Sequence, residues 1–309
     1  DNRTDYSNEN FENFKSYLIT IANRLSSNNP NSDYTQRDSL GFPDGYSMTS
    51  QDVMIPAFLA AYGGKKPEKI SLDYFPNIPL PNWRLTFNGL TDIDFIGEYF
   101  KNISVNHAYN STYTIGGFQS NIDFKESVDG FQYIRNQTGV FIPEYEINQM
   151  VITEQFSPLI SFDMTMHNSL TTRVEIKKSR NLALSFANNQ LTEVSSNEYV
   201  FGAGYRVKDV QFVFKAGGTS RRLSSDLNIK LDLSIRDNKT VLRKLVEDAN
   251  QISNGQKVIS INTSVDYMIS QSINLRLFYD QVVNNPYVSS QFRNSNINAG
   301  ISLSFTLAQ

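Results

Sequence analysis

The sequence contains no cysteine, which excludes disulfides, cysteine-ligated zinc, iron–sulfur clusters and thiol nucleophiles. Long hydrophobic runs are missing as well. Mean hydropathy is −0.38, and no window approaches the roughly eighteen consecutive apolar residues of a membrane-spanning helix. Any membrane role must therefore use strands. Charged residues make up only 19% of the chain and its net charge is −3. Because Lys and Arg form no basic stripe, nucleic acid is not an expected partner.

Aromatic residues and polar, weakly charged segments are abundant instead, with 16 Tyr and 21 Phe. From Asn82 onward the hydrophobic pattern has a period of two, which is typical of strands with one apolar and one polar face. The clearest example is the segment 227–236, where Leu and Ile alternate with Asn, Lys, Asp, Ser and Arg. The closing segment 297–307 alternates over about eleven residues, longer than the strands of a typical soluble sandwich. The pattern predicts an all-β fold of roughly ten or eleven antiparallel transmembrane β-barrel strands.

The first eighty or so residues differ from the rest. Apolar residues at helical spacing predict an amphipathic helix between Phe11 and Leu25, broken at Asn28–Asn29–Pro30. A second helix is predicted from Val53 to Tyr62, with Pro56 starting or kinking it. Three prolines between Phe75 and Pro81 predict an extended connector. We therefore expect residues 1–81 to form a helical and Pro-rich insertion or plug-like region, and residues 82–309 to form the barrel strands.

Short polar links predict tight hairpins between consecutive strands. Four such links are expected, at Asn168–Ser169, Asn188–Asn189, Lys208–Asp209 and Ser270–Gln271–Ser272. The segment Thr240 to Gly255 allows two interpretations. Val241 and Leu242 could extend the preceding strand, while Leu245 to Ile252 could form a helical loop.

Candidates for catalysis are few. The sequence has two histidines, His107 and His167. No nucleophile elbow is found beside either one, and neither has the spacing of a metal-binding motif. We therefore predict no catalytic, cofactor-binding or metal-binding residue. The alternative enzymatic hypothesis is a barrel hydrolase that depends on one of these histidines. Gly202 and Gly204 lie in a strand pattern and not in a phosphate-binding loop, so we expect them to permit strand bending or closeness to a bulky neighbour.

Charged residues on the polar sides of the strands are the candidate functional residues. They could tune what passes through a lumen, or simply be solvated and pair across strands, and the sequence leaves both readings open. Aromatic residues at strand ends are expected to anchor a membrane interface, namely Trp83, Tyr267, Tyr279 and Tyr287. The eight residues expected to face a lumen are Arg173, Glu175, Lys177, Lys230, Asp232, Arg236, Asp266 and Arg276.

Four segments carry a resemblance to a known family. They are Ser50 to Tyr62 followed by Phe75 to Leu90, then Leu227 to Lys239, and the closing strand with Asn298-Ala-Gly-Ile-Ser-Leu-Ser-Phe305. These segments resemble the C-terminal portion of the SprA (Sov) family, the giant outer-membrane translocon of the type IX secretion system. The resemblance covers essentially the whole chain.

The resemblance implies one segment of a barrel of about thirty-six strands in the outer membrane of a Gram-negative bacterium. Such a barrel exports folded proteins from periplasm to cell surface and supports gliding motility. The implied partners are the rest of the same barrel, a PorV-type shuttle barrel, a plug protein, secreted cargo proteins and outer-membrane lipid. The helical region would be a lumenal or periplasmic insertion, and the chain a piece of a longer protein. The alternative is a free-standing small barrel acting as a pore or adhesin.

Overall fold

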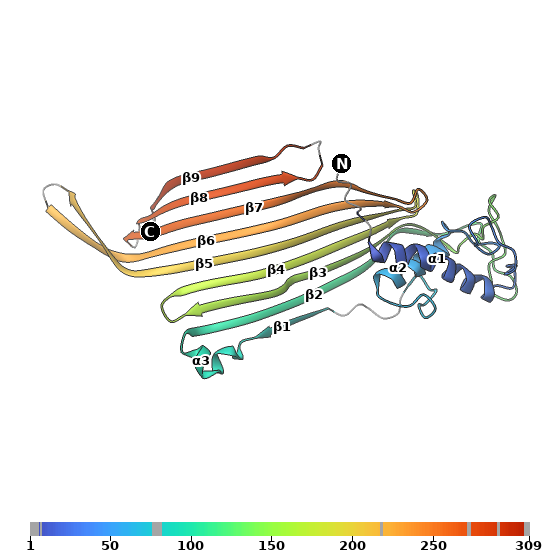
Figure 1. Ribbon diagram of the computed structural model, residues 1–309, viewed down its shortest axis with the longest axis horizontal. Coiled ribbons are helices and arrows are strands. Elements are labelled where there is room, and N and C mark those ends of the chain that lie inside the picture. The colour runs from blue at the N-terminus through green and yellow to red at the C-terminus, as the bar shows by residue number, and fades with distance from the viewer. Residues whose placement is uncertain are drawn as a thin grey trace.

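The computed structural model describes residues 6, 8–75, 82–216, 219–270, 273–288 and 291–305. These residues form a single antiparallel sheet of nine strands in sequence order, β1 to β9, with two helices at one end of it (Figure 1). This confirms the all-β class with helices in the N-terminal region. The sheet is open, because among the described residues β1 pairs only with β2 and β9 only with β8.

Most strands are much longer than those of soluble sheets, which average about five or six residues. β5 has 27 residues and β6 has 26, and together they extend beyond their neighbours at the end away from the helices (Figure 1). The strands are β1 Trp83–Phe87, β2 Phe100–Ser120, β3 Tyr145–Met166, β4 Leu170–Ser185, β5 Gln190–Ala216, β6 Thr219–Lys244, β7 Ala249–Ser270, β8 Ile273–Pro286 and β9 Asn294–Phe305.

The expected count of ten or eleven strands is wrong for the described residues, because the pattern splits strands that are continuous. The predicted hairpin at Lys208–Asp209 is instead a β-bulge within β5. Asp209 has a φ of 55°, and the pairing with β6 shifts between Val207 and Val210. A bulge accommodates extra residues without reversing the chain, so a polar pair that resembles a turn can sit inside a strand. A similar irregularity interrupts the pairing of β3 with β4 between Phe156 and Ile160, although β3 is continuous.

Two other predicted hairpins are confirmed. Ser169 links β3 to β4 with a φ of 70°, and Asn189 links β4 to β5 with a φ of 49°. Both values lie in the left-handed region that tight hairpin turns require. The predicted turn at residues 270–272 lies partly outside the described residues, at Gln271 and Ser272. In the segment 240–255 the strand extension is confirmed and the helical loop is wrong, since β6 ends at Lys244 and β7 begins at Ala249.

Both predicted helices are present. α1 spans Glu9–Asn28, and its preceding residue Asn8 accepts a hydrogen bond from the Asn10 amide. α2 spans Gln51–Tyr62 and ends at Gly63. Pro56 lies inside α2, so it does not start that helix. None of the helices in the described part of the chain combines the length and apolar character needed to cross a bilayer.

Between β1 and β2 the chain forms two short elements that the sequence pattern did not reveal. They are the 3-10 turn η1, Gly89–Asp92, and the one-turn helix α3, Asp94–Gly97. The predicted connector of residues 75–81 lies outside the described residues except for Phe75.

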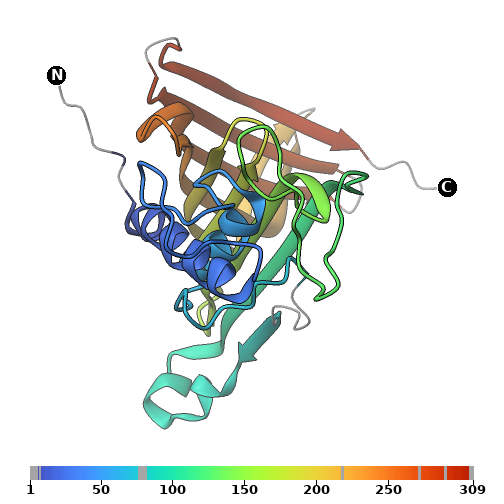
Figure 2. The same cartoon turned by 90° about the vertical axis from the view of Figure 1, so that its right-hand side faces the viewer.

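The main buried core lies where α1 and α2 meet the sheet, and we call the helices with their loops, residues 8–75, the helical module. Figure 2 views this end of the sheet and shows the two helices packed side by side against the strand ends. Phe14 of α1 and Phe58 of α2 are fully buried, with ring centroids 6.0 Å apart. Below them lie fully buried strand residues, namely Met150, Leu182, Leu184 and Leu191. The module therefore depends on the sheet to complete its core.

Candidate functional surfaces

The register of the sheet assigns each strand residue to one of two faces. Residues directly opposite each other on neighbouring strands point to the same side, so a row of partners can be followed across the sheet. One such row runs through Val174, Phe201, Leu233 and Ile261. We call the side with this row the apolar face and the opposite side the polar face.

The apolar face carries a continuous band of apolar side chains, which we call the apolar band. On β5 the band runs from Tyr199 to Val207 and on β6 from Leu227 to Ile235. Its members on the later strands come from the same rows, namely Ile259, Ile261, Val265, Tyr267, Leu275, Leu277, Tyr279, Val283, Ile297, Ala299, Ile301 and Leu303. On the earlier strands it continues through Leu85, Phe87, Val105, Ile160, Phe162, Met164, Leu170, Val174 and Ile176.

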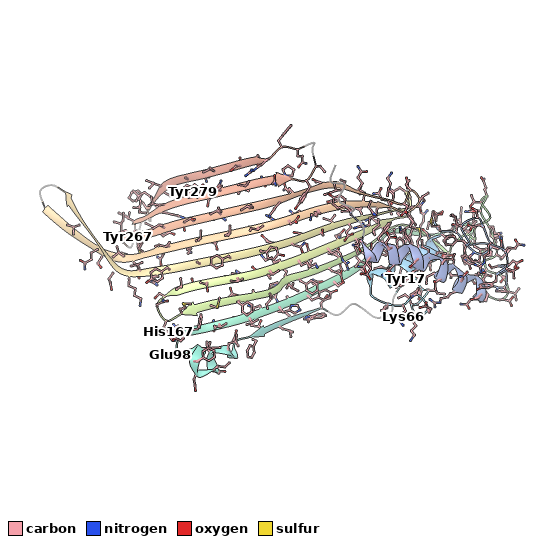
Figure 3. All side chains as sticks on the ribbon, viewed as in Figure 1. Tyr17, Lys66, Glu98, His167, Tyr267 and Tyr279 are labelled. Atoms are coloured by element: carbon pink, nitrogen blue, oxygen red, sulfur yellow. The ribbon has the colours of Figure 1, made fainter. Side chains whose placement is uncertain are left out.

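Many side chains of the apolar band are exposed. Phe201 on a central strand is 43% exposed, and Ile301 on the edge strand β9 is 73% exposed. The helical module covers only one end of this face, and Figure 3 shows Tyr267 and Tyr279 on the part of the sheet far from the module. The exposed apolar side chains thus extend across the sheet from β1 to β9, whereas soluble monomers usually expose large apolar side chains singly.

The eight charged residues predicted to face a lumen all lie on the polar face. Arg173 and Asp232 belong to one row through Gly202, and Lys177 and Arg236 belong to another through Glu198. Glu175 lies on β4 between Arg173 and Lys177, and Lys230 lies two residues before Asp232 on β6. Asp266 and Arg276 are direct partners on β7 and β8, in the row of Asn228. The register therefore brings all eight to one surface.

Several of these charges pair across or along strands. Glu175 is only 5% exposed and contacts both Arg173, at 3.1 Å, and Lys177, at 3.4 Å. Lys177 also lies 3.8 Å from Glu198, and Arg276 lies 3.8 Å from Asp266. The contacts of Lys177 with Glu198 and of Arg276 with Asp266 join neighbouring strands, whereas those of Glu175 run along β4.

Gly202 and Gly204 open a recess on the polar face of β5. A Cβ at Gly202 would lie 2.9 Å from Asp232 Oδ1, and one at Gly204 would lie 2.6 Å from Thr171 Oγ1. Both distances are shorter than real Cβ contacts, so the glycines permit close approach of neighbouring side chains, as the sequence predicted. Lys230 and Arg173 also line the recess.

One row marks the edge of the apolar band on the side of the helical module, and we call it the boundary row. It reads Trp83, Tyr109, Phe156, Lys178, Asn197, Asp237, Lys257 and Asn285 across eight strands. Its aromatic rings contact one another in sequence in tilted arrangements, with ring centroids 4.6 Å apart for Trp83 and Tyr109 and 4.8 Å apart for Tyr109 and Phe156. Apolar side chains give way to amphipathic and charged ones at this row.

The predicted aromatic anchors differ in their positions. Trp83 lies in the boundary row, and the Tyr287 hydroxyl donates to Asp237 of that row at 2.9 Å. Tyr267 lies toward the opposite edge of the band and donates to the Val210 carbonyl at 3.1 Å. Tyr279 lies in the middle of β8, where it pairs with Thr263 and Ala299, so its predicted place at a strand end is wrong.

Both histidines contact backbone carbonyls. His107 Nδ1 lies 2.6 Å from the Leu159 oxygen, among the aromatic rings of Trp83 and Phe156. His167 Nε2 lies 3.0 Å from the Gly97 oxygen, at the end of the sheet far from the helical module. The described residues contain no cluster of three or more His, Cys, Asp or Glu that could hold a metal ion.

A buried ion pair attaches the helical module to the apolar face. Arg243 of β6 contacts Glu193 of β5 at 2.7 Å, with side chains 4% and 10% exposed. Arg243 also donates to the Tyr6 carbonyl at 2.6 Å, and Asn8 donates to Glu193 at 3.3 Å. The module therefore packs on the face opposite to the eight charged residues.

Asp52 at the start of α2 is a buried carboxylate inside the helical module. Its Oδ2 accepts a hydrogen bond from Gln132 Nε2 at 3.0 Å, and its Oδ1 has no partner among the described residues. Burial raises the pKa of Asp52 from its ordinary value of 3.8 to about 6, although the Gln132 hydrogen bond opposes this rise. The folded state therefore binds more protons than the unfolded state between these two values, and stability falls as the pH rises through that window.

We expect Asp52→Asn to stabilise the helical module at about pH 8 by up to about 3 kcal/mol, and to lose this advantage near pH 4. The amide keeps the size of the carboxylate and accepts the same Gln132 hydrogen bond without a buried charge. Hydrogen exchange of the α2 amides at both pH values measures the effect. An equal change at both pH values would contradict a role for Asp52 ionisation.

Neither a protein-family model nor a curated protein sequence matches this chain.

Proposed function

We propose that this chain forms part of the wall of an outer-membrane β-barrel, as the C-terminal portion of a SprA-type translocon that exports folded proteins to the cell surface. The observation that carries the proposal is the uncovered apolar band on one face of a long-stranded antiparallel sheet whose other face is charged. In a membrane barrel the apolar face meets lipid and the polar face lines the lumen.

The height of the apolar band supports this assignment. From Tyr199 to Val207 the band covers nine residues of β5. At about 3.3 Å per residue this is about 30 Å along the strand, and a tilt of about 40° reduces it to about 23 Å along the membrane normal. Apolar bands of outer-membrane barrels are about 25 Å tall. The strands are longer than this band, so they would continue beyond the membrane toward the helical module.

The open edges favour a segment of a larger wall over a small free-standing barrel. The described sheet has nine strands, while single-chain bacterial barrels have an even number and close on themselves. An unpaired strand edge inside a bilayer is costly because its amide and carbonyl groups find no water. In the proposed assembly, further strands of the same barrel pair with β1 and β9. The pore or adhesin alternative would instead need β1 to pair with β9.

In this role the chain lines a passage for exported proteins and catalyses no chemical reaction. The eight charged residues of the polar face would present a hydrophilic surface to passing cargo, and most would stay paired with their neighbours. The PorV-type shuttle barrel, the plug protein and the secreted cargo remain proposed partners. The helical module would lie outside the barrel wall, beyond one membrane surface.

Native mass spectrometry of the assembly extracted from outer membranes in mild detergent tests the proposal, with peptide mapping of every polypeptide in it. We expect the peptides of this chain in one assembly with a much larger remainder of the same barrel. A closed monomer of the 309-residue chain alone would replace the translocon with the small-pore alternative. Absence of the chain from the membrane fraction would reject both.

A further inference from the structure

We propose that four lysines at the module-side edge of the apolar band, Lys65, Lys66, Lys178 and Lys257, form a basic rim that binds the phosphate groups of membrane lipids. The inference rests on the proposed membrane location and adds a lipid partner to it. Lys178 and Lys257 share one cross-strand row, and the adjacent Lys65 and Lys66 follow the end of α2, whose Tyr62 contacts Arg180 two residues from Lys178.

Two of the lysines belong to the boundary row. Lys178 is the direct partner of Phe156, next to the rings of Tyr109 and Trp83, and Lys257 lies three strands further on. Both side chains are exposed on the apolar face, immediately beyond the last row of the apolar band. Aromatic rings gather at the level of lipid headgroups, and lysines beside them reach the phosphates.

The other two lysines belong to the helical module. The Arg180 guanidinium lies 5.6 Å from the centroid of the Tyr62 ring, at the end of α2. Arg180 lies on the same face of the sheet as Lys178, two residues further along β4. The chain turns at the end of α2, with the Lys65 amide bonded to the Ala60 carbonyl. Lys65 and Lys66 are exposed just after this turn, and Figure 3 shows Lys66 below Tyr17 on the helical module.

Lysines on the two faces differ in whether they have a carboxylate partner within the described residues, and this difference points to an external anion on the apolar face. On the polar face, Lys177 lies within 4 Å of two carboxylates, those of Glu175 and Glu198. On the apolar face, none of the four rim lysines forms an ion pair or side-chain hydrogen bond with another described residue. Lys239, two residues from the boundary row, is already paired with Asp237 at 3.2 Å and is excluded from the rim for that reason.

Lipid phosphates are the anions that this position would meet. A lysine near an anionic membrane surface contributes about 1 kcal/mol, which is a factor of about five in affinity. Lys178 and Lys257 lie three strands apart, about 14 Å at the spacing of neighbouring strands. This separation exceeds a single phosphate, so the rim would contact the headgroups of several lipids side by side.

Adjacent residues on opposite faces provide a matched test. The complete barrel protein, purified in mild detergent, would be titrated with phosphatidylglycerol and with phosphatidylcholine, and bound lipid counted by native mass spectrometry. The variants are Lys178→Gln, its neighbour Lys177→Gln, and the fourfold change of Lys65, Lys66, Lys178 and Lys257 to Gln. We expect Lys178→Gln to weaken phosphatidylglycerol retention up to about fivefold and the fourfold variant by more than about tenfold. Lys177→Gln should leave it unchanged.

The outcomes separate this inference from the proposed function. Equal retention of phosphatidylglycerol by all variants, in a protein that is still embedded in the membrane, would contradict lipid binding by the basic rim. The proposed barrel-wall function would be unaffected. Equal loss in Lys177→Gln and Lys178→Gln would show a non-specific charge effect and also contradict lipid binding by the basic rim. Full competition by inorganic phosphate would identify a free anion site and not a lipid site. Loss of a copurifying acidic protein without loss of lipid would assign the rim to that protein instead.

Discussion

Replacing Arg243 by alanine is expected to destabilise the attachment of the helical module to the sheet by about 3 to 5 kcal/mol. The change leaves the Glu193 carboxylate buried without its cation, and removing one partner of a buried pair carries a cost of this size. It also removes the donor to the Tyr6 carbonyl and the guanidinium that lies 5.7 Å from the Phe11 ring centroid. Hydrogen exchange of the α1 amides in the complete protein measures the free energy of local opening.

Arg206 provides the matched control for Arg243. Its Nε and Nη2 both donate to one carboxylate oxygen of Asp226, as those of Arg243 do to Glu193, but its side chain is 58% exposed. Exposed pairs contribute about 0 to 1 kcal/mol, so Arg206→Ala should leave α1 exchange unchanged. The double change Arg243→Met with Glu193→Leu should recover most of the loss, because it removes both buried charges. If the α1 amides of the Arg243→Ala variant exchanged at the same rate as in the unsubstituted protein, the Glu193–Arg243 ion pair would not stabilise the attachment of the helical module.

In the proposed membrane location, replacing Ile261 by arginine is expected to destabilise the sheet by about 2 to 4 kcal/mol, the cost of a lipid-facing arginine near the middle of a bilayer. Ile261 lies in the apolar band between Leu233 and Gln281 on the neighbouring strands. Its neighbour Asn262 lies on the polar face between Asp232 and Asp280. Asn262→Arg should therefore be tolerated, because the new cation would meet two carboxylates in water.

The two arginine variants would be compared by urea unfolding in lipid vesicles and by the amount of assembled protein in the outer membrane. Their opposite faces are the decisive feature, since both positions lie on one strand and receive the same side chain. Equal effects of Ile261→Arg and Asn262→Arg would contradict the assignment of lipid to the apolar face. A larger loss for Asn262→Arg would reverse the two faces.

The class of fold and the faces of the strands follow from local patterns in the sequence. Successive side chains in a strand point to opposite sides, so the alternation of Leu227 to Arg236 already separates the future apolar and polar faces. The same reasoning placed all eight charged candidates on one face. The helices α1 and α2 were also predictable, because apolar residues at helical spacing and the stop signals at Asn29 and Gly63 are local features.

The joining of strands and the assembly of the surfaces were decided by tertiary structure. Lys208–Asp209 has the composition of a turn, and only the pairing of β5 with a continuous β6 turns it into a bulge. The basic rim and the ion pair between Glu193 and Arg243 join residues from separate strands and from the helical module. The sequence shows no basic stripe, because Lys178, Lys257 and the pair Lys65–Lys66 are far apart along the chain. The shared row of Lys178 and Lys257 depends on the cross-strand register, which long-range hydrogen bonding sets and a local pattern does not contain.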